Sequence, residues 1–216
     1  MIWRTRIKIC GITRAADALA AEAAGADAVG FVLWPGSQRC VSIDDASEIA
    51  AGLSPLITTV GVFVSPEPDD VRRSIESVGL SAVQLCGTIE PTALQAIRQM
   101  GARLIRSVSL EEWMRDSESD EFNDLMLDNC TPESPGGTGR TFVWGLIPKL
   151  PESTRLWLAG GLNAENVGSA VTKIAPFAVD VSTGVETRKG IKSPAKIAEF
   201  IAAVRAADAK LPMNTA

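Results

Sequence analysis

Short apolar segments alternate with amphipathic segments along the whole chain. Eight of the apolar segments are rich in Val, Ile and Leu and are bounded by Gly, Pro, Ser or Asn, which predicts β-strands buried on both faces. The predicted strands are Arg6–Ile12, Ala28–Leu33, Thr58–Val64, Ala82–Cys86, Arg103–Ser109, Asp124–Asp128, Leu156–Gly160 and Phe177–Ser182. Near-continuous apolar strands of this kind are typical of a parallel sheet.

Between the predicted strands, apolar residues recur at the i, i+3, i+4, i+7 spacing of a helix that buries one face. The clearest stripes are Ala46, Ile49, Ala50 and Leu53; Val167, Ala170, Val171 and Ile174; and Ile197, Phe200, Ile201 and Val204. Val71, Ile75 and Val78 mark another helix, and Leu110–Ser119 predicts a short one. Asn163 and the pair Ser193-Pro194 are helix-start signals.

Eight strands alternating with eight helical segments predict an α/β fold, a single (βα)8 TIM barrel with a parallel eight-stranded core. A doubly wound open sheet is the alternative, but Cys10-Gly11-Ile12-Thr13 is a poor match to the Gly-rich turn of nucleotide-binding sheets. The 216 residues fit the roughly 200 to 250 that one barrel needs. Because no segment resembles a linker, we expect one domain over residues 1–216, with a core of about 6–205 and a C-terminal tail at 208–216.

Alternation of side chains along a strand predicts which residues face the inside of the barrel. If Ile7 and Ile9 pack on helices, Lys8 and Cys10 point inward. The same rule places Gln84 and Cys86 of the fourth strand and Asp180 and Ser182 of the eighth strand inside. The first and eighth strands are neighbours in a closed barrel, so we expect Lys8 and Asp180 to form an ion pair. That pair could either stabilise the barrel or take part in its chemistry.

Composition excludes several classes of function. The net charge is −5, and no cluster of Lys or Arg is longer than a pair, which argues against a nucleic-acid partner. The N-terminus lacks the apolar core of a signal peptide, and no apolar run approaches the roughly 20 residues of a membrane span. We therefore expect a cytoplasmic protein with no membrane partner.

The chain contains no His and no Tyr, so acid–base chemistry must depend on Asp, Glu, Cys or Lys. The absence of His also argues against a catalytic metal site. The four cysteines, Cys10, Cys40, Cys86 and Cys130, form no CxxC pair, and isolated cysteines are usually buried apolar residues. Active sites of this fold lie at the C-terminal ends of the strands, which is where Cys10 and Asp128 fall.

Two glycine-bearing turns predict a phosphate site. Gly160-Gly161 follows the seventh strand, and Ser182-Thr183-Gly184 follows the eighth. Loops after these two strands form a recurring phosphate site in barrels, since glycine lets the backbone approach an anion closely. A third stretch, Pro135–Arg140, contains Gly137 and is predicted to fold over the ligand, although an ordinary connector is equally consistent with its composition.

Several motifs together resemble the phosphoribosylanthranilate isomerase family. Lys8-Ile9-Cys10-Gly11-Ile12-Thr13 is similar to the segment that opens these enzymes, and Asp180–Glu186 is similar to a segment near their end. Gly25–Val32, Val83–Leu85, Leu127-Asp128, Gly136–Gly139 and Gly160–Leu162 follow in the family's order. The resemblance covers residues 6–205, nearly the whole chain.

The resemblance implies an isomerase of tryptophan biosynthesis that performs an Amadori rearrangement of N-(5′-phosphoribosyl)anthranilate without a cofactor. It implies Cys10 as the general base, Asp128 as the general acid and Arg39 as the group that binds the anthranilate carboxylate. An apolar surround of Met126 and Leu127 is expected to favour the acid form of Asp128. Lys8, Gln84, Asp180 and Gly137 are further expected substrate contacts.

The chain departs from the family pattern at three positions. Cys86 replaces a histidine, Val143 stands where Asp is common, and Cys40 stands where an aromatic residue often follows the arginine. These differences leave three alternatives open: an isomerase or epimerase of another phosphorylated sugar, a non-catalytic binding protein for phosphorylated ligands, and a bisubstrate isomerase that also accepts a histidine-pathway intermediate. The last is disfavoured, because such an enzyme is expected to use Asp instead of Cys10. The sequence is compatible with a monomer and with a homodimer.

Overall fold

The structure is a computed structural model, which describes residues 4–115, 122–128, 147, 150–151 and 153–211. Eight parallel strands close into a barrel in which each strand pairs with its neighbours in chain order and β1 pairs with β8. The strands are β1 (Arg6–Cys10), β2 (Ala28–Val32), β3 (Thr58–Val64), β4 (Ala82–Cys86), β5 (Arg103–Val108), β6 (Asp124–Leu127), β7 (Arg155–Leu158) and β8 (Ala178–Val181). The closed parallel barrel confirms the predicted fold and excludes the open sheet.

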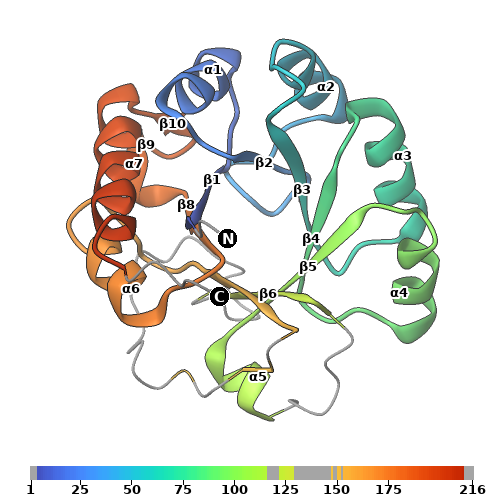
Figure 1. The fold of residues 1–216 in the computed structure, drawn as a ribbon. Coiled ribbons are helices and arrows are strands. Elements are labelled where there is room, and N and C mark those ends of the chain that lie inside the picture. The colour runs from blue at the N-terminus through green and yellow to red at the C-terminus, as the bar shows by residue number, and fades with distance from the viewer. Residues whose placement is uncertain (1–3, 116–121, 129–146, 148–149, 152, 212–216) are drawn as a thin grey trace.

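Helices surround the barrel, and Figure 1 shows this ring from the N-terminal ends of the strands. They are α1 (Ala15–Ala24), α2 (Ile43–Ala51), α3 (Pro68–Val78), α4 (Pro91–Arg98), α5 (Leu110–Arg115), α6 (Val167–Ile174) and α7 (Pro194–Asp208). The connection between β6 and β7 lies largely outside the described residues, so the eighth predicted helical segment stays a prediction. In the described part of the chain, no helix is long and apolar enough to cross a membrane.

Element ends follow local turn chemistry. The predicted bounds of β3 and β4 match the structure, whereas β1 ends two residues earlier than predicted because Gly11 leaves the extended conformation, with φ at 73°. Ser193 caps α7 by accepting a hydrogen bond from the Lys196 N–H at 3.4 Å, with Pro194 at the first position as predicted. Asn163 caps a turn just before α6 and not the helix itself, since its side chain accepts from the Glu165 and Asn166 N–H groups.

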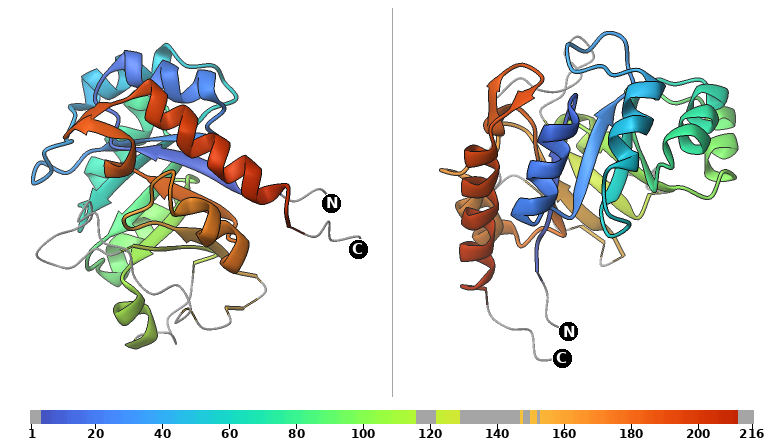
Figure 2. Two further views of the ribbon diagram at one scale, coloured as in Figure 1. Left: turned by 90° about the vertical axis from the view of Figure 1, so that its left-hand side faces the viewer. Right: turned by 90° about the horizontal axis from the view of Figure 1, so that it is seen from above.

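One feature of the fold was not predicted. After β8, a short 3-10 helix η3 (Thr183–Val185) leads into an antiparallel hairpin of β9 (Glu186–Arg188) and β10 (Ile191–Lys192). The hairpin and the loop after β2 extend from the same end of the barrel, as the left view of Figure 2 shows. This end carries the C-terminal ends of the barrel strands.

Side-chain alternation along the strands divides the core as predicted. Ile7 and Ile9 of β1 pack outward with residues of the surrounding helices, such as Phe200 of α7, in the main hydrophobic cluster. A second cluster fills the inside of the barrel and combines small with large side chains from seven strands and their ends: Ala28, Val60, Ala82, Ile105, Met126, Trp157, Ala159 and Ala178. The barrel is therefore a packed core with a polar layer nearer the C-terminal strand ends.

Polar contacts join Thr5, the residue before β1, to α7, the last helix. The Thr5 N–H and hydroxyl donate to the carboxylate of Asp208, the last residue of α7, at distances of 2.6 to 3.2 Å. Arg205 donates to the Thr5 carbonyl at 2.7 Å. These contacts fasten α7 across the β1–β8 seam.

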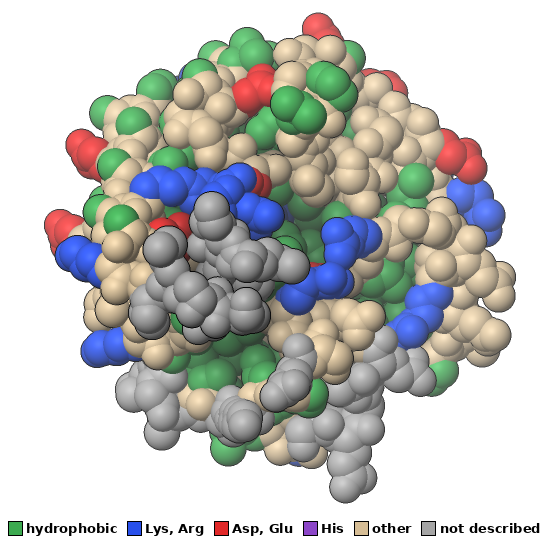
Figure 3. Space-filling view, in the orientation of Figure 1, with side chains coloured by type: hydrophobic (Ala, Val, Ile, Leu, Met, Phe, Trp, Pro, Cys, Tyr) green, Lys and Arg blue, Asp and Glu red, His purple; other side chains and the backbone are tan. Residues whose placement is uncertain are grey.

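At the N-terminal end of the barrel, Asp124 joins β6 to β7. Its carboxylate accepts two hydrogen bonds from Arg155, at 2.8 and 2.6 Å, and one from the Trp157 indole at 3.0 Å. The Arg155 guanidinium and the Trp157 ring both lie against Phe177. Figure 3 shows this end of the molecule, where several Lys and Arg side chains lie near the middle and most visible Asp and Glu side chains lie towards the outer edge.

We expect Asp124→Ala to lower the free energy of unfolding by about 2–4 kcal/mol, because it leaves the buried Trp157 N–H without its acceptor. Asp124→Asn retains one acceptor and should lose roughly half as much. Urea denaturation of both variants beside the wild-type protein measures this difference. Equal stability of all three proteins would contradict the assignment of Asp124 as the link between β6 and β7.

Candidate active site

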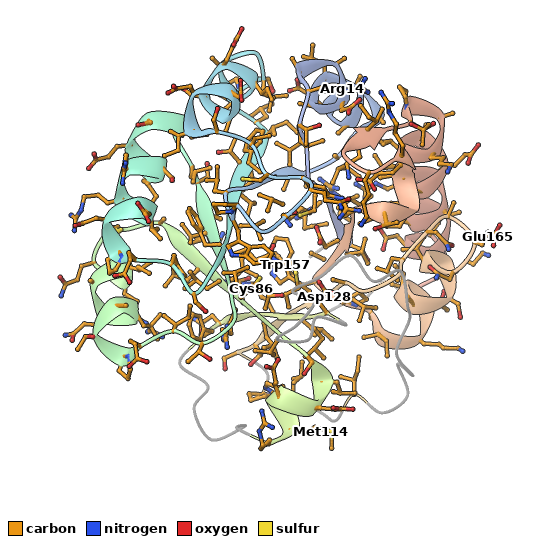
Figure 4. The ribbon with its side chains drawn as sticks, turned by 180° about the vertical axis from the view of Figure 1, so that it is seen from behind. Arg14, Cys86, Met114, Asp128, Trp157 and Glu165 are labelled. Carbon is orange, nitrogen blue, oxygen red and sulfur yellow. The ribbon has the colours of Figure 1, made fainter. Side chains whose placement is uncertain are left out.

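A pocket of about 200 Å³ opens at the C-terminal ends of β6, β7 and β8. It is lined by Asp128, Ala159, Gly160, Gly161, Leu162, Asn163, Asp180, Val181, Ser182, Thr183 and Gly184. Figure 4 views the molecule from this end, with Cys86, Asp128 and, deeper in the barrel, Trp157 near the middle of the view, and with Arg14, Met114 and Glu165 at its periphery. Asp128, the two predicted glycine turns and Asp180 thus share one cavity.

Lys8 lies at the centre of the barrel, beneath the pocket. Its ammonium group is fully buried and donates to Asp180 Oδ1 at 2.8 Å and to Gln84 Oε1 at 2.9 Å, which confirms the predicted pair. Burial alone would lower the pKa of Lys8, but the negative charge of Asp180 and the neighbouring Cys10 outweigh burial and raise it above its ordinary value. Lys8 is therefore a permanent cation inside the barrel.

Cys10 ends β1 two residues further along and is 7% exposed. A methyl group added at Gly30 on β2 would lie 3.0 Å from Cys10 Sγ and 3.2 Å from Lys8 Nζ, which places the thiol and the ammonium group beside the same point. Burial raises the pKa of the Cys10 thiol, and Asp180 adds to this effect. Lys8 and Lys192 act in the opposite direction, because a nearby cation favours the thiolate.

Cys86, at the end of β4, packs with Cys10 and Val62 inside the barrel. Burial raises the pKa of Cys86 to about 11, and the nearby charge of Asp128 adds to this effect. Cys86 is therefore a neutral thiol near neutral pH. In the described part of the chain, no three metal-ligating side chains come together, so these cysteines are not part of a recognisable metal site there.

The two glycine turns form one continuous backbone surface. Gly160 and Gly161 have φ values of 82° and 68°, a conformation that favours glycine. A methyl group added at Gly184 would lie 2.0 Å from the Leu162 carbonyl oxygen, so the turn after β8 can touch the turn after β7 only because residue 184 has no side chain. Among the described residues, the N–H groups of Gly160 and Gly161 have no hydrogen-bond partner, which leaves them available to an anion.

Arg39 reaches the same end of the barrel from the loop after β2. The side chain is largely buried instead of solvated, and its Nη2 donates to the Thr183 hydroxyl at 3.0 Å. A methyl group at Gly11 would lie 2.6 Å from Arg39 Cδ and 3.0 Å from Ser182 Oγ, so the glycine after Cys10 makes room for this approach. The carboxylate-binding role of Arg39 stays a prediction.

Two charged residues were not among the predicted site residues. Glu186 of β9 accepts two hydrogen bonds from Arg39, both at 2.8 Å, and one from Lys192 of β10 at 2.9 Å. Burial would raise the pKa of Glu186, but hydrogen bonds from Arg39 and Lys192 hold it below its usual value. Burial also lowers the pKa of Lys192, although Glu186 and Cys10 oppose this shift. The position of Glu186 at the end of the Asp180–Glu186 motif was a signal in the sequence that could have indicated it.

Some predicted features lie outside the described residues. These are Gly137 with the rest of the 135–140 stretch, Cys130 and Val143. The predicted loop over the ligand and the effect of Val143 on the substrate therefore stay predictions. Cys40 is half-buried, and its thiol donates to the carbonyl of Val41 at 3.7 Å.

Comparisons with known proteins show the family to which this chain is similar. The family model described as N-(5'phosphoribosyl)anthranilate (PRA) isomerase matches residues 7–203. The N-(5'-phosphoribosyl)anthranilate isomerase of Chromohalobacter salexigens is 43% identical over 204 residues, which cover 93% of this chain and 94% of the relative. The corresponding enzyme of Herminiimonas arsenicoxydans is also 43% identical, over 98% of this chain and 97% of its own.

Solved structures give the same result. The crystal structure of the phosphoribosyl anthranilate isomerase of Thermotoga maritima has a TM-score of 0.83 and 44% identity, and the match covers 94% of this chain and 99% of that one. A phosphoribosyl anthranilate isomerase in complex with reduced 1-(o-carboxyphenylamino)-1-deoxyribulose 5-phosphate has a TM-score of 0.81 and 41% identity over the same shares. The Thermotoga maritima protein is also described as dimeric.

We expect Lys8→Met to lower the free energy of unfolding by roughly 3–5 kcal/mol, because it leaves the buried Asp180 carboxylate without its cation. Combining it with Asp180→Asn removes the uncompensated charge and should recover at least about half of the loss. Chemical denaturation of the wild type, both single variants and the double variant measures the coupling between the two residues. Strictly additive losses would contradict a direct ion pair.

Proposed function

This chain belongs to the N-(5'-phosphoribosyl)anthranilate isomerase family and is an isomerase, and on that basis we propose that it rearranges N-(5′-phosphoribosyl)anthranilate to 1-(2-carboxyphenylamino)-1-deoxyribulose 5-phosphate in tryptophan biosynthesis. The observation that carries the proposal is the single pocket into which Asp128 and both glycine turns open, above the buried Cys10. The reaction moves hydrogen within one molecule and needs no cofactor.

The phosphate of the substrate binds at the two glycine turns in this proposal. The N–H groups of Gly160 and Gly161 offer donors from one side, and the first N–H groups of η3, which follow Ser182, offer them from the other. Backbone donors are fixed by the fold, so they bind an anion without the ordering of a flexible side chain.

The anthranilate carboxylate binds at Arg39. Among the described residues, Nε and Nη2 of Arg39 have hydrogen-bond partners, whereas Nη1 has none. A free guanidinium nitrogen next to the phosphate turns can meet a carboxylate at the other end of the same ligand. This arrangement suits a substrate with two separated anionic groups.

Asp128 and Cys10 divide the proton transfers. Asp128 donates a proton to the furanose ring oxygen, so the C1–O bond breaks and the nitrogen lone pair forms a C1–N iminium. The Cys10 thiolate then removes the proton from C2, and the electron pair of that C–H bond becomes the C1–C2 double bond of an enolamine. Return of a proton to C1 and ketonisation at C2 complete the aminoketose.

Two alternatives remain distinguishable. An isomerase of another phosphorylated sugar would use the same phosphate turns, and the neutral thiol of Cys86 next to Cys10 is the described feature that favours a changed sugar or aryl contact. A non-catalytic binding barrel would bind the ligand without turning it over. The presence of both Cys10 and Asp128 at the pocket end disfavours this second alternative.

We expect the wild-type protein to consume phosphoribosylanthranilate generated in situ from anthranilate, with loss of its fluorescence. Cys10→Ala and Asp128→Asn should each reduce kcat by about 10²–10⁴-fold, since each removes one proton-transfer group. Asp69→Asn serves as the matched control for Asp128→Asn, since Asp69 is an exposed residue of α3 away from the pocket, and its activity should stay within about twofold of the wild type. A well-folded wild-type protein that leaves this substrate unchanged would overturn the proposed function.

The pH dependence of kcat/KM reports the base in the free enzyme. Cys10 acts as a thiolate, and burial raises its pKa, so the rising limb of kcat/KM that reports this thiol should lie at higher pH than the ionisation of an exposed cysteine. Lys8→Met removes a cation that lowers this pKa, so the rising limb should move to higher pH. Lys8→Arg keeps the positive charge and should move it less. A limb that does not respond to Lys8→Met would contradict Cys10 as the base.

A further inference from the structure

The hairpin of β9 and β10 supplies two buried charges that contact both proposed anion-binding regions. Glu186 holds the Arg39 fork through two hydrogen bonds of 2.8 Å. Lys192 donates to Glu186 Oε1 at 2.9 Å and to the carbonyl and hydroxyl oxygens of Ser182, both at 3.2 Å. Arg39, at one proposed subsite, is thereby connected to Ser182, at the start of the other, through two side chains.

The charges in this cluster do not cancel. Arg39 and Lys192 contribute two positive charges and Glu186 contributes one negative charge, which leaves a net charge of +1. The Lys192 side chain is fully buried, and the Glu186 side chain is 4% exposed, so water screens these charges weakly. If Glu186 paired with Arg39 alone, its negative charge would cancel the positive charge that is proposed to attract the substrate carboxylate. The second positive charge, on Lys192, leaves the cluster with a net positive charge.

The hairpin that carries the cluster is fixed on several sides. The backbone N–H of Lys192 donates to Asp17 of α1 at 3.0 Å, and the Thr13 hydroxyl donates to the Gly190 carbonyl at 2.5 Å. Within the hairpin, the Gly190 N–H donates to Glu186 Oε1 at 3.2 Å. From outside it, Lys196 of α7 donates to the Glu186 carbonyl at 2.8 Å. A carboxylate held in this way can set the position of the arginine bound to it.

We propose that Glu186 and Lys192 are positioning residues that fix Arg39 relative to the turn at residues 182–184, and so select ligands whose carboxylate and phosphate have one particular separation. The proposal rests on the proposed function, because it assumes a substrate with both groups. It assigns the hairpin a part in substrate selection, while Cys10 and Asp128 keep the proton transfers. A ligand with one anionic group needs only one subsite and is insensitive to the spacing between them.

The test compares two ligands on the folded protein by calorimetry. Reduced 1-(o-carboxyphenylamino)-1-deoxyribulose 5-phosphate carries both anionic groups, and inorganic phosphate carries one. We expect Lys192→Met to weaken binding of the reduced compound at least thirtyfold and binding of phosphate no more than about threefold, because the misplaced arginine affects only the doubly anionic ligand.

Glu186→Gln provides a second variant that retains the shape of the side chain. It leaves Arg39 charged but held by weaker hydrogen bonds, so binding of the reduced compound should weaken at least tenfold, while binding of phosphate should change by no more than about threefold. Glu76→Gln is the matched control, since Glu76 is an exposed residue of α3 outside this hydrogen-bond network. Its kinetics and binding should stay within about twofold of the wild type.

The outcomes separate the two proposals. Wild-type protein that neither binds the reduced compound nor turns over phosphoribosylanthranilate refutes the proposed function and this inference with it. Wild-type protein that does both, with Lys192→Met and Glu186→Gln lowering only the thermal midpoint, leaves the function intact and refutes the positioning role. If the variants weaken binding of the reduced compound and binding of phosphate equally, the proposal that the hairpin selects ligands by the separation of their anionic groups is refuted.

Discussion

A lysine with no access to water sits in the middle of this barrel, and much of the site depends on how its charge is compensated. Lys8 lies between Asp180 and Gln84, so three strands that are distant in sequence, β1, β4 and β8, share one charge. An unpaired ammonium group in that position would cost several kcal/mol, which makes Asp180 a requirement of the fold. The same ammonium group lies beside the Cys10 thiol and favours its ionised form. Stability and the proposed base chemistry therefore rely on the same ion pair.

Close backbone contacts give the pocket its shape. The turn after β8 touches the turn after β7 at Gly184, and the chain after β1 lets Arg39 and Ser182 approach at Gly11. Any side chain at these two positions would need neighbouring backbone or the arginine itself to move. The absence of a side chain at Gly11 and at Gly184 therefore helps to set the positions of the proposed carboxylate and phosphate subsites. The fold can hold them rigidly because both turns continue directly from paired strands.

The sequence predicted the barrel and its polar interior because both follow from local alternation. Thr58–Val64 and Ala82–Cys86 have the predicted bounds, and the rule that places Ile7 and Ile9 outside places Lys8 and Cys10 inside. The hairpin at 186–192 was not predicted, since strands of two and three residues are too short to show periodicity. The partner of Arg39 was not predicted either, because Glu186 is 147 residues away and no local pattern reports such a contact. Local rules thus predict elements and the faces of strands, whereas long-range charge pairs depend on the closed barrel.

The distribution of charge in the site agrees with the division of labour proposed for it. The phosphate turns present backbone N–H groups, so a phosphate needs no lysine of its own there. The buried cations are then left for other tasks: Lys8 lies beside Cys10, and Arg39 with Lys192 lies on the side proposed for the carboxylate. Lys192 also favours the Cys10 thiolate, so the cation that pairs with Glu186 lowers the pKa of the proposed base as well. Although the chain has a net charge of −5, three cations, Lys8, Arg39 and Lys192, are buried at the end of the barrel proposed to bind an anionic substrate.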